Sequence, residues 1–191
     1  MSLDSSVIET HATGAMLPVD GLERAVHSAG SVKPKIEEIA AKDLTAGQQS
    51  LIYSLVLRTL SDTLKSDYFA DITAKKAVIY YVGNFEGVAI TYMTEYGNLL
   101  DILAVENPRN GIGSRLFNHV ASKSDGRVFC RSQPIRGYRD WYANRTDSIQ
   151  TFPNVEGTTY DHFFKGMSQA QTDGASELFR NKGSNYEPRT H

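Results

Sequence analysis

The chain has 191 residues, of which 40% are hydrophobic, with 20 Lys and Arg against 22 Asp and Glu. That content is enough for one good hydrophobic core, and a net charge of −2 without a basic run gives no indication of a nucleic-acid partner. The single cysteine excludes an internal disulfide and makes the cytoplasm the default location, with the mitochondrial matrix as the eukaryotic alternative. No apolar run approaches a membrane span and no signal-peptide pattern opens the chain, so we expect no membrane partner.

The chain begins without a long regular element. Residues 1–34 are interrupted by Gly and Pro, and we predict a linker or the remnant of a preceding domain there. Residues 35–44 are predicted to form a short helix or strand that leads into the domain. Thr45 followed by Gln48 is a capping-box pattern, and the apolar spacing behind it predicts an amphipathic helix to about Lys65. The four residues after Lys65 would end this helix.

Three strands separated by tight turns are predicted next, over residues 76–82, 85–94 and 99–105. The third of them is an apolar run interrupted only by Asp101. Its length and composition are typical of a central strand, and we expect it to lie in the middle of the sheet.

A glycine-rich turn follows this strand. Gly111 and Gly113 open a predicted helix whose apolar residues fall on one stripe up to Ala121. Glycines before a helix N-terminus let backbone N–H groups approach an anion such as phosphate, although the same pattern also fits a plain turn before a helix. The P-loop lysine is missing, and Leu116 stands where a dinucleotide fingerprint has its third glycine.

The last third of the chain is less regular. Residues 127–131 are predicted to form a short strand, and residues 133–147 form a polar, aromatic and arginine-rich stretch of the kind that carries function in a compact domain. A late strand is predicted over 158–165. We place the domain at residues 35–167 and expect a flexible C-terminal tail over 168–191, where hydrophobic residues become sparse.

The segment from Arg109 through the two glycines to Leu116 resembles the pyrophosphate-binding loop of the GNAT acyltransferases, which bind acetyl-CoA. Further motifs between residues 45 and 167 resemble, in order and spacing, the N-acetyltransferase domain of vertebrate-type N-acetylglutamate synthases and bifunctional bacterial synthase–kinases. In that family the domain follows an amino-acid-kinase domain. Residues 20–31 of this chain faintly resemble the end of that kinase domain. The further motifs are Ser66-Asp67-Tyr68-Phe69, Phe85-Glu86-Gly87-Val88-Ala89-Ile90, Leu100-Asp101-Ile102-Leu103-Ala104-Val105, Cys130-Arg131-Ser132-Gln133, Trp141-Tyr142 and Phe163-Phe164-Lys165-Gly166-Met167.

The resemblance implies an α/β fold of the GNAT kind, with a mixed, mostly antiparallel central sheet flanked by helices. It implies acetyl transfer from acetyl-CoA to the amino group of a glutamate-like amino acid, as in arginine biosynthesis, with a homo-oligomer or a kinase domain as partner. Tyr142 would protonate the leaving thiolate, and Arg131 and Arg136 would bind the carboxylate of the acceptor. No metal is predicted, since the five histidines are scattered. The donor would bind at Leu103, Ala104, Val105, Arg109, Asn110, Gly111, Ile112, Gly113, Ser114 and Arg115.

The acceptor side departs from the family pattern. Ile102 replaces a lysine, Gln133 replaces an arginine, and Arg136 replaces an asparagine. These changes leave three alternatives open: a glutamate-like acceptor, another acceptor bound near Arg136 and Arg139, or a non-catalytic module that only binds acetyl-CoA. Tyr142 also fits a packed aromatic residue and Arg131 a surface arginine, while Cys130 is expected to be a small buried residue without a nucleophilic role.

Overall fold

The computed structural model describes residues 34–134 and 137–188. The linker expected over residues 1–34 lies outside the described residues except for Pro34, and so does Arg136. The compact unit described here begins at Pro34. Its elements are β1 (Ile36–Ala40), η2 (Ala41–Asp43), α1 (Ala46–Leu60), α2 (Tyr68–Ala74), β2 (Val78–Val82), β3 (Gly87–Met93), β4 (Asn98–Val105), η3 (Pro108–Asn110), α3 (Ile112–Ser122), β5 (Val128–Ser132), α4 (Arg139–Ala143), β6 (Ser148–Pro153), β7 (Thr159–Lys165) and α5 (Gln169–Asn181).

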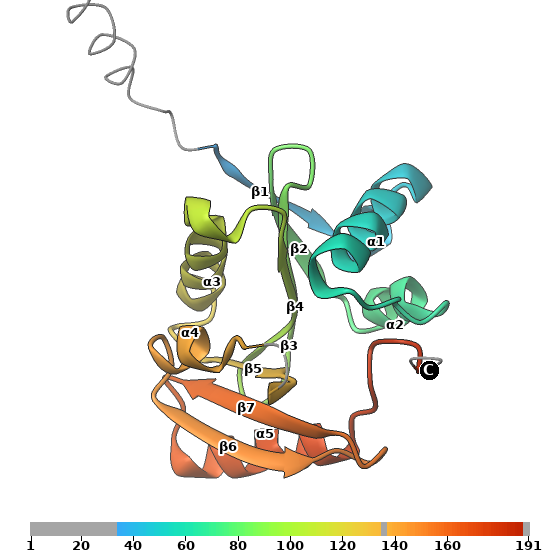
Figure 1. The fold of residues 1–191 in the computed structure, drawn as a ribbon. Helices are drawn as coiled ribbons and strands as arrows, with labels where there is room; N and C mark the ends of the chain where they lie inside the picture. The colour runs from blue at the N-terminus through green and yellow to red at the C-terminus, as the bar shows by residue number, and fades with distance from the viewer. Residues whose placement is uncertain (1–33, 135–136, 189–191) are drawn as a thin grey trace, which may run out of the picture. The chain divides into compact units, whose positions relative to one another are not determined.

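The strands form one seven-stranded sheet in the order β1-β2-β3-β4-β5-β7-β6 (Figure 1). All neighbouring strands are antiparallel except β4 and β5, which run parallel. The predicted fold class, a mixed and mostly antiparallel sheet flanked by helices, is confirmed. The apolar run at 99–105 lies at the centre, as β4, with three strands on each side.

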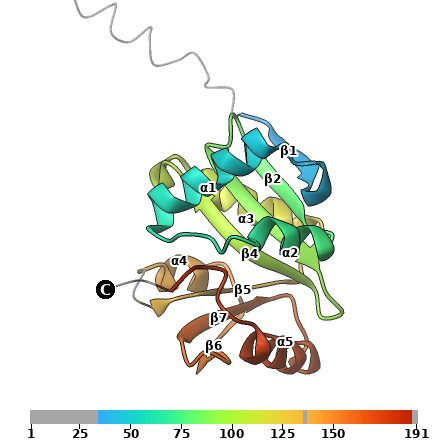
Figure 2. The same ribbon diagram turned by 90° about the vertical axis from the view of Figure 1, so that its right-hand side faces the viewer.

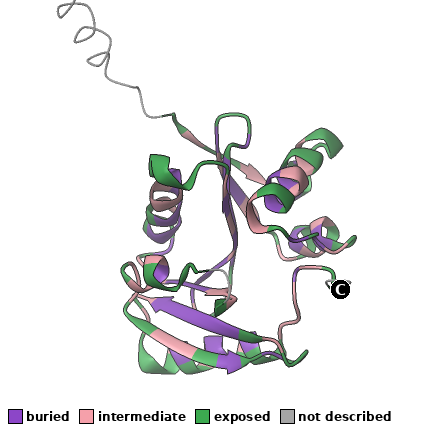
Figure 3. Ribbon diagram, viewed as in Figure 1, coloured by how far each residue is buried: buried purple, intermediate pink, exposed green. Residues whose placement is uncertain are grey.

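Helices cover both faces of the sheet. Buried residues of α1, α2 and α5, among them Leu55, Ile72 and Phe179, belong to one apolar cluster. Buried residues of α3 and α4, among them Phe117 and Tyr142, belong to a second cluster on the other face. The turned view places α1 and α2 in front of the strands (Figure 2), and the buried residues gather on the strands and on the helix sides that face them (Figure 3).

The first helix forms by the predicted capping box but ends earlier than predicted. The Thr45 side chain accepts from the Gln48 N–H, and the Gln48 side chain accepts from the Thr45 N–H. The helix ends at Leu60 because Ser61 takes a left-handed conformation with φ 55°. Tyr68 and Phe69, which were expected to end a helix, instead begin α2. The Tyr68 side chain is buried in the core.

Two elements near the C-terminus were not predicted. β6 is an edge strand that pairs only with β7, and its apolar pattern is too weak to stand out in the sequence. The flexible tail expected after residue 168 is wrong for the described residues, because α5 has a capping box at Ser168 and Gln171. Ala175 and Phe179, one helical turn apart, are both buried against the sheet, and Leu178 packs against the same apolar cluster, so a narrow apolar face holds this helix.

Candidate active site

The sheet opens at the middle of β4. The pairing of β4 with β5 runs from Asn98 opposite Val128 to Leu100 opposite Cys130 and stops there. β3 continues to pair with β4 up to Val105, while β5 continues beside β7. The second half of β4 therefore has one unpaired edge, which can accept an extended ligand as an additional strand.

Backbone alternation indicates which groups face this edge. The Glu106 N–H donates to the Glu86 carbonyl, which lies toward β3, at 2.8 Å. In a strand the backbone groups of successive residues point to alternate sides, so those of Leu103 and Val105 face the open edge. Both residues were predicted to bind the donor.

The open edge borders a cavity of about 480 Å³, which we call the donor cavity. Leu103 and Val105 line it from β4, Gly113 from the start of α3, and Tyr142 from α4. These residues come from three segments that the sequence analysis assigned separately, and the fold brings them to one cavity. The remaining lining residues are Arg58, Thr59, Leu60, Glu106, Pro108, Tyr138 and Trp141.

The start of α3 presents backbone N–H groups beside the donor cavity. Gly111 has φ +77°, a left-handed conformation that favours glycine at this N-cap. The Asn110 side chain accepts from the Ile112 N–H at 3.1 Å, whereas the N–H groups of Gly113 and Ser114 have no acceptor among the described residues. A Cβ at Gly113 would lie 3.5 Å from Val105 Cγ2, so this glycine stands directly against the strand.

The two predicted arginines of this loop differ in their placement. Arg109 is exposed on η3, with its backbone N–H bonded to Asn107. The Arg115 guanidinium donates to the Pro34 carbonyl. Sequence reasoning missed Arg145, whose guanidinium donates to Ser114 Oγ at 2.9 Å and to the Trp141 carbonyl at 2.7 Å. Arg145 thereby ties the start of α3 to α4, the helix that carries Tyr142.

Tyr142 is packed as firmly as a core residue. It is 8% exposed, and its ring stacks on that of Phe163 with centroids 4.8 Å apart. Tyr142 also lines both the donor cavity and a smaller neighbouring cavity of about 50 Å³, which we call the acceptor cavity. The structure thus supports the packed-aromatic interpretation and also gives Tyr142 a place at the junction of the two cavities.

Arg131, which was expected to bind the carboxylate of the acceptor, lines the smaller cavity, and its guanidinium is already bonded. It donates to the Lys182 carbonyl at 2.9 Å and to the Gly183 carbonyl, and it lies 4.5 Å from the centroid of the Tyr160 ring. In this arrangement Arg131 holds the chain after α5 through these two carbonyls. Sequence reasoning could not anticipate these bonds, because they connect residues about 50 positions apart.

Asp101 is the residue that sequence reasoning undervalued. The register of β3 against β4 shifts between Ile90 and Thr91, which leaves Asp101 as the extra residue of a bulge. Its side chain is 2% exposed and accepts from the Tyr68 hydroxyl at 3.1 Å, and the Lys182 ammonium lies 3.3 Å away. The signal available in the sequence was a lone carboxylate inside an otherwise apolar strand.

The electrostatics around Asp101 favour the charged form. Burial alone would raise the pKa of its carboxyl, but Lys182, Asn185, Arg131 and Tyr68 together hold that pKa below its usual value. Burial lowers the pKa of Lys182, an effect that Asp101 partly offsets. Asp101 therefore remains a carboxylate at neutral pH and is suited to binding a cation rather than to accepting a proton.

Other chemistries find little support in the described residues. Cys130 is 1% exposed and burial raises the pKa of its thiol, which confirms the expected small buried residue. Within residues 34–134 and 137–188, no three His, Cys, Asp or Glu side chains come together as a possible metal site. Among those residues, too, no helix has the length and apolar character needed to cross a membrane.

A scan against protein-family models and a search of curated proteins found no match. Among solved structures, one titled "The crystal structure of acetyltransferase" is similar to this chain at 16% sequence identity and a TM-score of 0.47. The similarity covers 70% of this chain and 100% of that one. A similarity this distant says nothing about activity, so the function has to be argued from the geometry of the site.

Proposed function

We propose that this protein is an N-acetyltransferase that transfers an acetyl group from acetyl-CoA to a primary amine. The observation that carries the proposal is the donor cavity, where the open edge of β4, the start of α3 and Tyr142 meet. An open strand edge can pair with the amides of a pantetheine arm, and a helix N-terminus can bind a pyrophosphate.

Different residues at the cavity can assist different steps of the reaction. The N–H groups of Gly113 and Ser114 would bind the pyrophosphate, and a backbone N–H of Leu103 or Val105 would stabilise the oxyanion of the tetrahedral intermediate. As the carbon–nitrogen bond forms and the carbon–sulfur bond breaks, Tyr142 gives its hydroxyl proton to the thiolate. Tyr142 then recovers a proton from the ammonium formed on the acceptor nitrogen.

The acceptor proposed from the sequence resemblance is an amino acid of the glutamate type, bound through Arg131. The position of Arg131 in the acceptor cavity supports a carboxylate-bearing acceptor, since a guanidinium binds a carboxylate with two parallel hydrogen bonds. Its present bonds to the carbonyls of Lys182 and Gly183 mean that such an acceptor must first displace them.

A second candidate function is a non-catalytic domain that binds acetyl-CoA for regulation or oligomer contacts. The observation in its favour is the occupied acceptor side, where Arg131 and Asp101 both bind residues of the same chain. A domain of this kind would bind the donor without using it.

Two measurements on the purified chain test the proposal and separate the candidates. Calorimetry with acetyl-CoA reports donor binding, and release of free thiol with a panel of amino acids and amines reports transfer. We expect binding together with amine-dependent thiol release. Binding without release from any amine supports the non-catalytic domain, and absence of binding contradicts both.

A further inference from the structure

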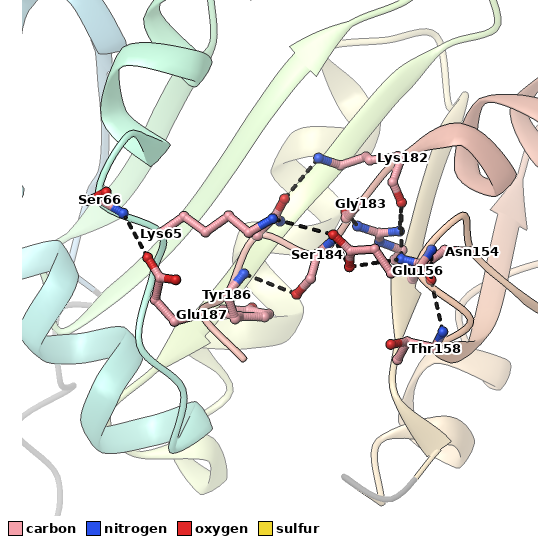
Figure 4. A network of polar contacts seen from close by, with 12 residues as sticks. Lys65, Ser66, Asn154, Glu156, Thr158, Lys182, Gly183, Ser184, Tyr186 and Glu187 are labelled. Atoms are coloured by element: carbon pink, nitrogen blue, oxygen red, sulfur yellow. Dashed lines mark hydrogen bonds and ion pairs between the residues drawn. The ribbon is translucent and has the colours of Figure 1, made fainter. Parts of the chain in front are cut away.

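The chain after α5 crosses the acceptor side as an extended segment. We call residues 182–188 the C-terminal strap. The Ser184 N–H donates to Glu156, in the turn after β6, at 2.8 Å (Figure 4). The Lys65 N–H donates to the Asn185 carbonyl at 3.0 Å. The strap thus runs from the turn between β6 and β7 to the loop between α1 and α2, where Leu64 and Tyr186 form an isolated bridge.

One residue of the strap contacts both charged groups of the acceptor side. The Lys182 ammonium lies 3.3 Å from Asp101 Oδ1, with the two side chains 12% and 2% exposed. The carbonyl of the same lysine accepts from Arg131 at 2.9 Å. Asp101 and Arg131 both line the acceptor cavity together with Tyr142.

We propose that Asp101 and Arg131 are the acceptor-binding pair, and that they take a primary amine carrying a carboxylate or carbonyl oxygen at the spacing of a lysine residue. This inference rests on the proposed acetyltransferase function and names its substrate class, which replaces the glutamate-type acceptor that the sequence resemblance implied. Lys182 lines the neighbouring pocket beside Tyr68 rather than the acceptor cavity, and its ammonium supplies Asp101 with the charge that an acceptor would bring. Free lysine, a lysine side chain in a peptide and an ω-amino acid share this chemistry.

The energetics favour exchange of one ammonium for another. A buried carboxylate without a counter-ion is strongly unfavourable, so Asp101 needs a cation whether or not the strap is in place. An incoming ammonium would replace that of Lys182 without leaving the carboxylate bare. Before it attacks the thioester this ammonium has to release one proton to water, because only the neutral amine has a lone pair and Asp101 stays ionised. The rest of the strap is held mainly by backbone hydrogen bonds, among them those from the Lys65 N–H to the Asn185 carbonyl at 3.0 Å and from the Glu187 N–H to the Thr63 carbonyl at 2.8 Å.

The amine site is tested first without any acetyl transfer. In Lys182→Ala the Asp101 carboxylate loses its ammonium, and an alkylamine added to the buffer should restore it. We expect n-butylammonium to raise the melting temperature by about 5–10 °C at about 100 times its dissociation constant. The double variant Lys182→Ala/Asp101→Asn should show no such rise, because no charge remains to be neutralised.

Lys65→Ala is the matched control, since it removes another lysine of the same network whose partner, Glu156, is partly exposed. It should gain nothing from the amine. Equal rises in Lys182→Ala and in either control would overturn the inference, and so would no rise in Lys182→Ala. If Lys182→Ala does not fold alone, we measure instead how much folded protein is recovered on refolding with and without n-butylammonium. Higher recovery with the amine in Lys182→Ala alone supports the inference, and equal recovery with and without the amine overturns it.

The spacing is tested on the wild-type chain with 6-aminohexanoate, whose ammonium and carboxylate are separated as Nζ and the carbonyl are in lysine. With acetyl-CoA, we expect a kcat/KM more than about tenfold higher for 6-aminohexanoate and L-lysine than for L-glutamate, whose second carboxylate would meet Asp101. A preference for glutamate would overturn the inference. Amine rescue of Lys182→Ala with no acetylated product from any amine would leave the ammonium site standing and contradict the proposed function instead.

Discussion

Tyr142 offers the sharpest test at the scale of a single residue. Its ring stacks on Phe163 and is 8% exposed, so Tyr142→Phe keeps the packing and removes only the hydroxyl. We expect kcat to fall by roughly 10²–10⁴-fold, the usual worth of a positioned acid, with the affinity for acetyl-CoA little changed. Steady-state kinetics with calorimetry on the same preparation checks both values, and wild-type turnover in the variant would remove Tyr142 from the mechanism.

His162 makes a second prediction, about stability. It is fully buried on β7 with its ring stacked on Phe152, and burial, together with Arg131, lowers its pKa to about 4. The imidazole is therefore neutral in the folded protein, whereas the unfolded chain binds a proton below its ordinary pKa of about 6.5. The stability that His162 contributes is present above that value and is lost as the pH falls from about 6.5 to about 4, by up to about 3 kcal/mol.

Urea unfolding at several pH values in this window measures the effect. His162→Phe keeps an aromatic ring in the same stack and removes the titration, so its unfolding free energy should fall less steeply with acid than that of the wild type. Parallel curves for the two proteins would show that His162 does not carry this dependence.

At the residue scale, the sequence could predict which residues gather at the larger cavity, whereas it could not predict the contacts of Arg131 and Asp101. Gly113, Leu103 and Tyr142 stand in local motifs, a turn before a helix, a strand end and an aromatic pair, and the fold places all three at one cavity. The bonds of Arg131 and Asp101 to the C-terminal strap join residues that are far apart in sequence. A local pattern contains no information about such pairs.

At the scale of an element, the start of α3 carries the donor-binding hypothesis. A Cβ at Gly113 would meet only Val105 at 3.5 Å and Trp141 at 3.8 Å, which are ordinary contacts, and a longer side chain would extend into the donor cavity. We expect Gly113→Leu to weaken acetyl-CoA binding at least about tenfold, or about 1.4 kcal/mol. Its unfolding free energy should be unchanged or slightly higher, since leucine is the better helix former.

Gly47→Leu is the control for this variant. Gly47 lies in the first turn of α1, where a Cβ would meet only Thr45 Oγ1 at 3.9 Å. The same substitution in an equivalent helix position away from the cavity should leave the calorimetric affinity for acetyl-CoA at the wild-type value. Equal affinities in Gly113→Leu and Gly47→Leu would show that the donor does not bind at α3.

Elements with a strong periodic pattern were predictable, and those held by few contacts were not. The sequence predicts β4 from an apolar run and α3 from an apolar stripe. The bounds of both elements in the structure lie within one or two residues of the prediction. α5 buries only a narrow face around Ala175 and Phe179 and is otherwise polar, so its composition resembled that of a tail. The short edge strand β6 lacks a clear alternation for a similar reason.

At the scale of the whole molecule, β4 separates two sides of one site. The donor cavity lies at its open edge beside α3 and α4, while the bulge turns Asp101 toward Tyr68 of α2 on the opposite face of the sheet. Tyr142 and Leu103 line both cavities. A donor and an acceptor can therefore be bound together, with the reacting atoms meeting at the end of β4.

This arrangement predicts direct transfer within a ternary complex. Among the described residues no histidine or cysteine lines either cavity, so the Ser–His or Cys–His pair that most often forms an acyl-enzyme intermediate is missing there. Ser132, which lines the acceptor cavity, donates its hydroxyl to the Gln133 carbonyl at 3.5 Å. The Thr59 hydroxyl, which does border the donor cavity, donates to the Leu55 carbonyl at 2.8 Å. Double-reciprocal plots of rate against amine at several acetyl-CoA concentrations should accordingly intersect. Parallel lines, or an acetyl group found on the denatured chain by mass spectrometry after incubation with acetyl-CoA alone, would contradict direct transfer and point to a covalent intermediate.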